Sequence, residues 1–278
     1  MKGSKADIIA QLQRNILLLQ GFKPATSDST IQAGLHFIQN AFPNSRFPTG
    51  VIHEFFCNNA EEVSASCGFV SGVLSSLMKS EGISFWITSS QNIFPPALRL
   101  FGINPEKIIF LHLINEKEKL WAMEEALKCD QLSSVIGEIN EISFTESRRF
   151  QLITEKSHVN GFIIRRNPKN LSTACVTRWK IRPTHSCFEK VTISSGEKVG
   201  ISSMDKLRII DNNETENKNF FNSRTKGIPG VGYPNWVVSL LKVRNGKPGS
   251  WKLQWRNGKF ELALPPQLII QEELRKIG

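Results

Sequence analysis

Short apolar runs and longer segments of helical period alternate along much of the chain. Between residues 31 and 185, the first five runs rich in Ile, Val and Phe start 24–32 residues apart, and helix-period segments separate them. Such alternation is typical of a parallel sheet whose strands are joined by right-handed helical crossovers. The pattern predicts strands at residues 51–56, 83–88, 107–113, 133–139, 161–166 and 173–181, and helices that begin near Glu61, Pro96, Glu116 and Thr145.

The two ends of the chain differ from this core. An apolar stripe at helical spacing predicts an N-terminal helix within residues 1–24, which Gly21 and Pro24 bring to an end. Residues 186–220 show neither strand-like apolar runs nor helical spacing, and are predicted to be an irregular linker or insert. Residues 221–278 hold three alternating segments joined by RNGKPGS and RNG, and Asn-Gly favours tight hairpin turns. They are predicted to form a basic C-terminal antiparallel β-meander and a tail.

Charge is distributed unevenly along the 278 residues. The net charge is +10, but residues 1–147 hold 11 Lys or Arg against 15 Asp or Glu (−4), whereas residues 148–278 hold 24 against 10 (+14). This asymmetry favours a polyanion or an acidic partner for the second half, the alternative being a solvated basic surface. Five cysteines without a CxxC pair, and the absence of a secretory signal or a long apolar run, predict a cytoplasmic protein with reduced thiols and no membrane contact.

The turn after the first core strand lies where many α/β proteins bind a phosphate. Such a turn needs glycines whose N–H groups converge on the anion, a Lys for the phosphates and a Ser or Thr for magnesium. Residues 57–68 read CNNAEEVSASCG, with neither Gly nor Lys in the turn itself. The residues of this turn, predicted to be a degenerate phosphate loop that binds no cofactor, are Cys57, Asn58, Asn59, Glu61 and Glu62.

Glu61 and Glu62 decide that prediction. Carboxylates at a helix N-terminus stabilise the helix through its dipole. They repel a triphosphate, because like charges about 4 Å apart cost roughly 4 kcal/mol at an effective dielectric near 20. No neighbouring cation is expected to offset this repulsion.

Other catalytic or metal-binding patterns are missing from the sequence. The strand at 83–88 is followed by Ser89 and Ser90 rather than a carboxylate, and Glu138 is the only acid of the strand at 133–139, where it is expected to lie in a solvated loop. The five histidines show no HxxxH or HExxH spacing, and no GxSxG occurs. The sequence therefore predicts no catalysis and no metal, and a working ATPase with an unrecognised phosphate loop is kept as an alternative.

Several segments in order resemble the core of RecA-type recombinases. They are AGLHFIQNAFPNSRFPTGVIHEFF, with Pro48-Thr49-Gly50 before the first core strand, then GISFWITSS and LRLFGINPEKIIF. A RecA-like scaffold without the Walker A lysine and glycines and without the Walker B aspartate resembles the ImuA family. RWKIRP (178–183) and residues 236–255 also look like segments characteristic of that family. The resemblance implies an α/β fold with a RecA-like, mostly parallel sheet flanked by helices.

The resemblance also implies a function. Members of the ImuA family are non-catalytic accessory factors of SOS-induced, error-prone translesion DNA synthesis, and work with an ImuB-type inactive relative of Y-family polymerases and a specialised replicative-type polymerase. Contact with RecA or with DNA, and association with the nucleoid when engaged, are further implications. The related SulA family shares the degenerate scaffold and blocks cell division by binding FtsZ. A division inhibitor or a RecA-filament regulator that acts purely by protein binding is therefore the alternative.

Two basic clusters are the predicted DNA- or partner-binding residues. The first comprises Arg165, Arg166, Lys169, Arg178, Lys180 and Arg182, expected on strand ends and the loop between them. The second comprises Lys242, Arg244, Lys247, Lys252, Arg256 and Lys259, expected on the meander and its turns. Trp251 and Trp255 share one face of the middle meander strand, and we expect them to pack in the core rather than to stack on bases.

Overall fold

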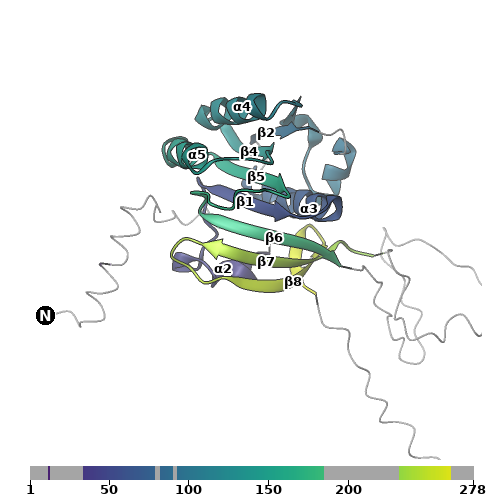
Figure 1. Cartoon of the computed structure of the whole chain (residues 1–278). Helices are drawn as coiled ribbons and strands as arrows, with labels where there is room; N and C mark the ends of the chain where they lie inside the picture. Colours follow the sequence, from purple (N-terminus) through teal and green to yellow (C-terminus); the bar gives the residue numbers. More distant parts are fainter. Residues whose placement is uncertain (1–11, 13–33, 79–81, 90–92, 185–231, 264–278) are drawn as a thin grey trace, which may run out of the picture. The chain divides into compact units, whose positions relative to one another are not determined.

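The structure is a computed structural model that describes residues 12, 34–78, 82–89, 93–184 and 232–263 (Figure 1). The described strands form one nine-stranded sheet in the order β3-β2-β4-β5-β1-β6-β7-β8-β9. The strands are β1 (Ile52–Cys57), β2 (Ile83–Thr88), β3 (Ile108–His112), β4 (Leu132–Glu138), β5 (Asn160–Arg166), β6 (Thr177–Thr184), β7 (Asn235–Val243), β8 (Gly249–Arg256) and β9 (Lys259–Leu262).

The pairing of the strands divides the sheet into two parts. Strands β1 to β6 pair only in parallel with one another, whereas β7, β8 and β9 pair antiparallel, starting from β6. The predicted α/β class, with a mostly parallel sheet and a C-terminal antiparallel meander, is therefore confirmed. The predicted helix within residues 1–24 and the insert at 186–220 lie outside the described residues, apart from Leu12.

Helices cover both faces of the parallel strands. They are α2 (His36–Gln39), α3 (Ala60–Leu77), α4 (Glu116–Lys128) and α5 (Phe144–Ser157), with the 3₁₀ helices η1 (Pro43–Ser45), η2 (Pro95–Phe101) and η3 (Pro105–Lys107). Alternate residues of β1 point to opposite faces, so Phe55 packs in the core that includes α3, and Ile52 packs in the core that includes α4 and α5. None of the described helices is long and apolar enough to cross a membrane.

Helix starts follow from local capping chemistry. The side chains of Asn59, Asn115 and Ser143 each accept a backbone hydrogen bond from the first turn of α3, α4 and α5. At α5 the bond is reciprocal, because the side chain of Glu146 accepts from the backbone N–H of Ser143 at 2.8 Å. These caps place the start of each helix within one residue of its predicted position.

The apolar face of the meander joins the α3 core. Phe260 of β9 lies against α3 so closely that a Cβ on Gly72 would be 2.5 Å from its ring, which only glycine permits without movement. Trp255 is buried and donates its Nε1–H to the carbonyl of Leu100 at 3.0 Å, and Trp251 packs against the same core half-buried. Both tryptophans therefore pack as expected.

Two predicted elements differ from the structure. The segment near Pro96 is a 3₁₀ helix rather than an α-helix, and its end is marked by Gly102 in the left-handed region. Strand β6 begins at Thr177, four residues later than predicted. Before it, the Thr173 hydroxyl donates to Glu54 and the Ala174 N–H donates to Ser147, so these residues bind a buried side chain and α5 instead of extending the strand.

Candidate functional site

The turn between β1 and α3 is closed by its own side chains. The Asn59 Oδ1 accepts from the backbone N–H of Glu62 at 2.8 Å, and the Glu62 carboxylate turns back to accept from the backbone N–H of Asn58 at 2.7 Å. Glu62 is only 6% exposed. A carboxylate and an amide oxygen thus take up one N–H donor each at the start of α3, donors of the kind that bind phosphate at other helix N-termini.

A lysine from a distant strand completes this arrangement. The Lys180 Nζ lies 3.5 Å from the Glu62 Oε1 and 5.9 Å from the centre of the Phe56 ring. The expectation that no cation offsets the acidic pair is therefore wrong. Because β1 pairs with β6 and Phe55 stands opposite Trp179, the next residue of β6 reaches the end of β1. The local sequence of the turn gives no signal for this contact.

The thiol beside the turn is protonated. The Cys57 Sγ and the Ser66 Oγ are 3.3 Å apart, and burial raises the pKa of Cys57 to about 11. A thiolate is the reactive form of cysteine, so Cys57 is not a nucleophile at neutral pH. Within the part of the chain that the structure describes, no three His, Cys, Asp or Glu side chains are close enough to hold a metal.

Glu54 forms a buried ionic cluster in the middle of the sheet. Its Oε1 accepts from the Arg165 Nη1 at 2.5 Å, and its Oε2 accepts from the Arg178 Nε at 2.7 Å and from the Thr173 hydroxyl at 2.9 Å. The side chains of Arg165, Arg178 and Glu54 are 0%, 16% and 1% exposed. We call Glu54, Arg165, Arg178 and Thr173 the Glu54 cluster.

The Glu54 cluster corrects the first predicted basic surface. Arg165 cannot face DNA or a partner, because its guanidinium is fully buried, and Arg178 is mostly buried by the same carboxylate. The guanidinium of Arg165 also donates to the carbonyls of Asn140 and Asn170, which fixes the loops that follow β4 and β5. The signal that sequence reasoning missed was Glu54 itself, since an acid within an apolar strand requires a buried cationic partner.

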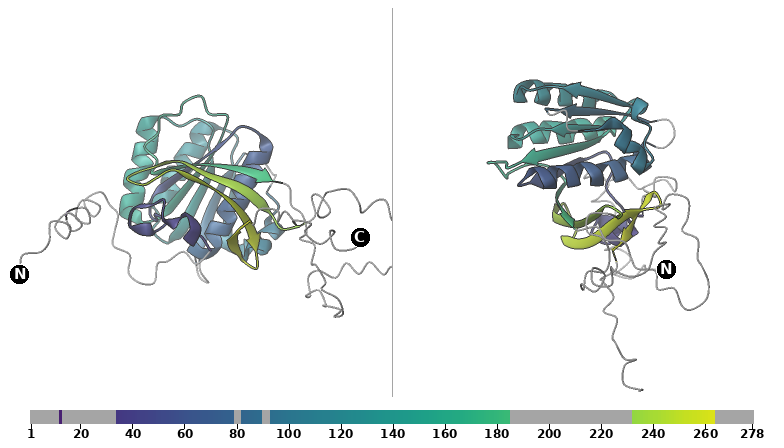
Figure 2. Two further views of the ribbon diagram at one scale, coloured as in Figure 1. Left: turned by 90° about the horizontal axis from the view of Figure 1, so that it is seen from below. Right: turned by 90° about the vertical axis from the view of Figure 1, so that its right-hand side faces the viewer.

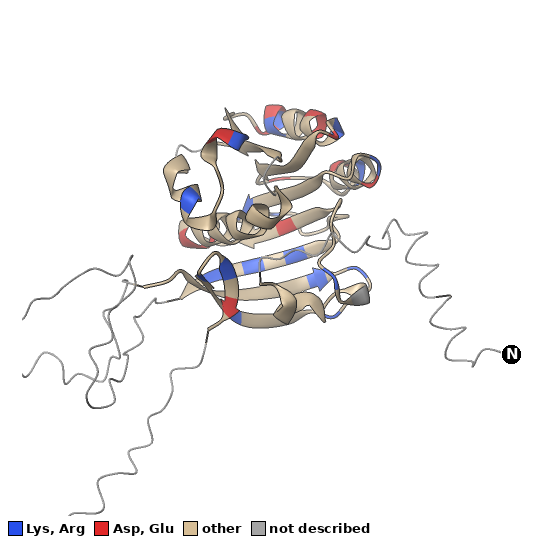
Figure 3. Cartoon of the chain, turned by 180° about the vertical axis from the view of Figure 1, so that it is seen from behind, with Lys and Arg blue, Asp and Glu red and all other residues tan. Residues whose placement is uncertain are grey.

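The other predicted basic residues occupy several places. Lys242 and Arg244 bind the carbonyls of Thr173 and Ala174, at 3.0 and 3.4 Å. The exposed residues of the set are Arg166, Lys169, Arg182, Lys242, Lys247, Lys252 and Lys259, and Arg256 is half-buried. Figure 3 shows Lys and Arg recurring along the antiparallel strands, whereas the acidic residues lie mostly on the helices.

The strand register arranges part of this set on one face. Arg182 stands opposite Val237, which stands opposite Lys252, so that two cations lie in one row across β6, β7 and β8, roughly 10 Å apart. Ser239 and Ser250 form the neighbouring row, with hydroxyls 2.9 Å apart and exposed. We call this side of β6, β7 and β8 the basic face; on the other side of the same strands, apolar side chains such as Ile181, Val238 and Leu253 pack in the α3 core. Figure 2 shows how the meander, in yellow-green, continues the sheet beyond β6.

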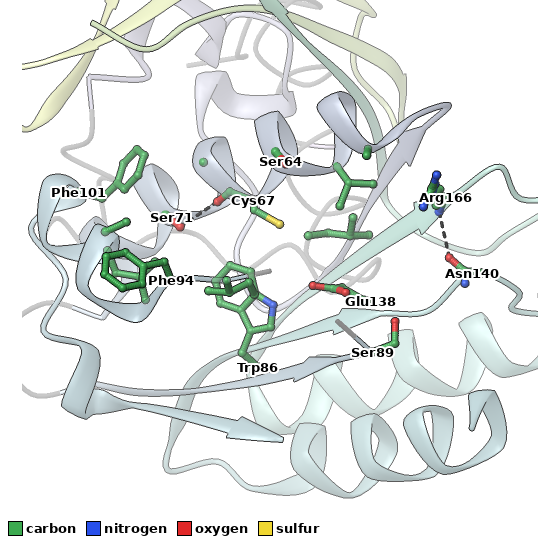
Figure 4. Close-up of a pocket in the computed structure, with 17 residues that line it drawn as sticks. Ser64, Cys67, Ser71, Trp86, Ser89, Phe94, Phe101, Glu138, Asn140 and Arg166 are labelled. Carbon is green, nitrogen blue, oxygen red and sulfur yellow. Dashed lines mark hydrogen bonds between the residues drawn. The ribbon is translucent and has the colours of Figure 1, made fainter. Parts of the chain in front are cut away.

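A cavity of about 340 Å³ lies between α3, η2 and the carboxyl ends of β2, β4 and β5. Figure 4 shows Phe94 and Phe101 at one end, the polar side chains of Glu138, Asn140 and Arg166 at the other, and Trp86 between them. The chain leaves β2 toward η2 on the α3 side and leaves β4 toward α5 on the other side. Such reversals are where open α/β sheets bind ligands. The sequence did not indicate this cavity, and it placed Glu138 in a solvated loop.

Comparisons with known proteins agree with the sequence resemblance. The chain is 24% identical over 242 residues to Protein ImuA of Caulobacter vibrioides, in strain NA1000 / CB15N and in strain ATCC 19089, and the match covers 82% of this chain and 84% of the relative. This similarity, over most of the length of both chains, supports membership of the ImuA family. No protein-family model matches the sequence.

A second similarity, to SulA proteins, covers a smaller part of the chain. The chain is 26% identical over 117 residues to the cell division inhibitor SulA of Yersinia pestis, a match that covers 42% of this chain and 68% of the relative. Among solved structures, SulA from Pseudomonas aeruginosa matches with a TM-score of 0.36 at 16% identity, covering 43% of this chain and 100% of that chain. The ImuA match therefore extends over about twice as much of this chain as the match to SulA of Yersinia pestis.

Proposed function

We propose that this protein is a non-catalytic accessory factor of SOS-induced, error-prone translesion DNA synthesis. In this role its RecA-like scaffold acts as an adaptor for an ImuB-type protein and a specialised DNA polymerase. The proposal is supported by the similarity to Protein ImuA over 82% of the chain. The structural observation that carries it is the closed turn before α3, where the Glu62 carboxylate accepts from the Asn58 N–H and lies beside Lys180.

Nucleotide binding at this turn would require several contacts to break. The Glu62 carboxylate would have to leave the Asn58 N–H and the Lys180 ammonium, and its largely buried side chain would have to move into solvent. Lys180 alone cannot replace a phosphate loop, because it is already paired and lies on β6 rather than on α3. The turn therefore supports a scaffold that presents surfaces and does not hydrolyse ATP.

Calorimetry with Mg-ATP tests this part of the proposal. We expect no heat of binding at millimolar nucleotide, and we expect the same result for Glu62→Ala, because that change restores neither the glycines nor the lysine of a phosphate loop. Glu62→Ala should instead destabilise the protein by about 1 kcal/mol, as lost helix caps do. Micromolar binding of Mg-ATP to the unchanged protein would overturn the non-catalytic assignment.

The basic face is the surface that we propose for DNA or for an acidic partner. If Arg182 and Lys252 of this face meet phosphates together with the other exposed cations of the predicted set, about half a dozen in all, affinity for a single-stranded oligonucleotide falls by roughly 10³ between 50 and 200 mM salt. The variant Arg182→Ala/Lys252→Ala should weaken binding and flatten this salt dependence. The matched control is Lys117→Ala/Lys156→Ala, which removes two exposed cations from α4 and α5. Binding that ignores salt, or that both variants weaken equally, would exclude the basic face.

Partner capture distinguishes the adaptor from its alternative. The alternative is a division inhibitor that acts by protein binding, and the similarity to SulA supports it. The purified chain should retain ImuB-type and specialised polymerase partners, or a RecA-type recombinase, and should leave GTP-dependent assembly of an FtsZ-type protein unchanged. Inhibition of that assembly at equimolar protein, without capture of the polymerase partners, would replace the adaptor with the division inhibitor.

A further inference from the structure

Trp86 is a buried donor in the cavity between α3 and η2. It lies in β2, its side chain is 0% exposed, and its Nε1–H has no hydrogen-bond partner among the described residues. Buried polar groups are nearly always paired, so an unpaired indole N–H that lines a cavity indicates an acceptor supplied by a ligand. Figure 4 shows the indole nitrogen on the side of the ring that faces Glu138.

The surroundings of this nitrogen define the chemistry of the ligand. Phe94, just before η2, and Phe101, its last residue, form an aromatic end, and Glu138, a carboxylate acceptor, lies at the polar end of the cavity. A ligand that fills the space therefore needs a flat apolar body and one terminal group that both accepts and donates a hydrogen bond. A phenol has both features, since its ring packs against aromatic side chains and its hydroxyl accepts from an N–H and donates to a carboxylate.

The rim of the cavity indicates that the phenol belongs to a polypeptide. Phe94, which lines the cavity, remains 67% exposed, Leu100 of η2 remains 65% exposed, and a small free phenol inside would leave both in water. An extended chain lying across the mouth would cover them and could bind the exposed Arg166 with a backbone carbonyl. Exposed apolar side chains grouped around a pocket are typical of protein interaction sites.

We propose that this cavity binds a tyrosine side chain from an extended segment of a partner protein. The ring lies between the aromatic end and Trp86, and the hydroxyl accepts from the Trp86 Nε1–H and donates to Glu138. A phosphorylated tyrosine is excluded, because its dianion would face the Glu138 carboxylate. That the occupant is a partner protein rests on the adaptor function proposed above, whereas recognition of the phenol does not.

Nuclear magnetic resonance of the full ¹⁵N-labelled chain tests the site with N-acetyl-tyrosine amide as the probe. The chain has six tryptophans, so Trp86→Phe assigns its indole N–H signal by difference, and Trp121→Phe, at an exposed position 67% accessible on α4, is the matched control. We expect the tyrosine amide to shift the Trp86 indole proton downfield and to saturate. N-acetyl-phenylalanine amide should bind roughly tenfold more weakly, because it leaves the polar groups unpaired.

The variants separate recognition from simple filling of an apolar space. Trp86→Phe and Glu138→Gln should each reduce the preference for tyrosine over phenylalanine, and Trp121→Phe should leave it unchanged. Equal affinity for the two amides, or a Trp86 indole signal that neither amide moves, would overturn the proposal. If Trp86→Phe does not fold, Glu138→Gln gives the same comparison. These measurements involve neither DNA nor ATP, so their failure would leave the proposed function standing.

Discussion

Replacing Glu54 by Gln should be among the most destabilising conservative changes in this protein. The substitution keeps the size of the side chain but removes the negative charge that faces two guanidinium groups, one 0% and the other 16% exposed. Removing one partner of a buried ion pair typically costs about 3–5 kcal/mol, because the remaining charge stays buried without compensation. Glu141 lies 3.7 Å from Arg165, but it is 47% exposed and can compensate little. A loss of this size is a large part of the 5–15 kcal/mol typical of a domain.

Urea unfolding followed by circular dichroism measures this effect. The free energy of unfolding of Glu54→Gln should fall by about 3 kcal/mol or more with an unchanged dependence on urea. The matched control is Glu124→Gln, which breaks a 2.6 Å ion pair with Arg149 at the surface and should cost less than about 1 kcal/mol. If Glu54→Gln is no less stable than Glu124→Gln, the Glu54 cluster does not hold the sheet as described.

Three further predictions concern side chains buried elsewhere. Burial lowers the pKa of His53 to about 3 from 6.5, so the folded state stays neutral while the unfolded state takes up a proton below about pH 6.5. Stability should therefore fall as the pH drops from 6.5 toward 3, by up to about 1.4 kcal/mol per unit, and urea unfolding of His53→Phe should lack that contribution. Among the cysteines that the structure describes, exposed Cys129 should react first with a thiol reagent mapped by mass spectrometry, and Cys57, whose pKa burial raises to about 11, should resist until unfolding. Gly72→Val should lower the melting temperature through its clash with Phe260, and normal melting would show that β9 does not pack on α3.

The order of the elements could be predicted because each has a local cause. Strand β2 was predicted at its observed bounds, since a short run rich in β-branched and aromatic residues lies between Gly82 and Ser89. The hairpin between β8 and β9 followed from Asn257-Gly258, both of which have the positive φ that such a turn requires. These features depend on neighbours in the chain, and a single sequence contains them.

The binding residues were harder to predict because their surroundings depend on strand register. Nothing in the segment around Arg165 distinguishes it from the exposed Arg166 that follows, and only the pairing of β5 with β1 places the first beside Glu54. The contact of Lys180 with Glu62 likewise depends on β6 lying next to β1. The tyrosine site requires η2, which was predicted as an ordinary helix, to stand over the ends of β2 and β4.

Strand β6 connects two regions that a truncation experiment would try to separate. It shares hydrogen bonds with β1 on one side and β7 on the other, and its Trp179 contacts Phe55 and Phe69 within the α3 core. A chain cut after Thr184 would leave an unpaired strand edge and an uncovered aromatic layer, which are features of aggregating proteins. Loss of activity in such a shortened chain would then report misfolding rather than a missing contact. Point substitutions of exposed side chains on these strands are the better way to assign an activity to one surface, because they leave the sheet intact.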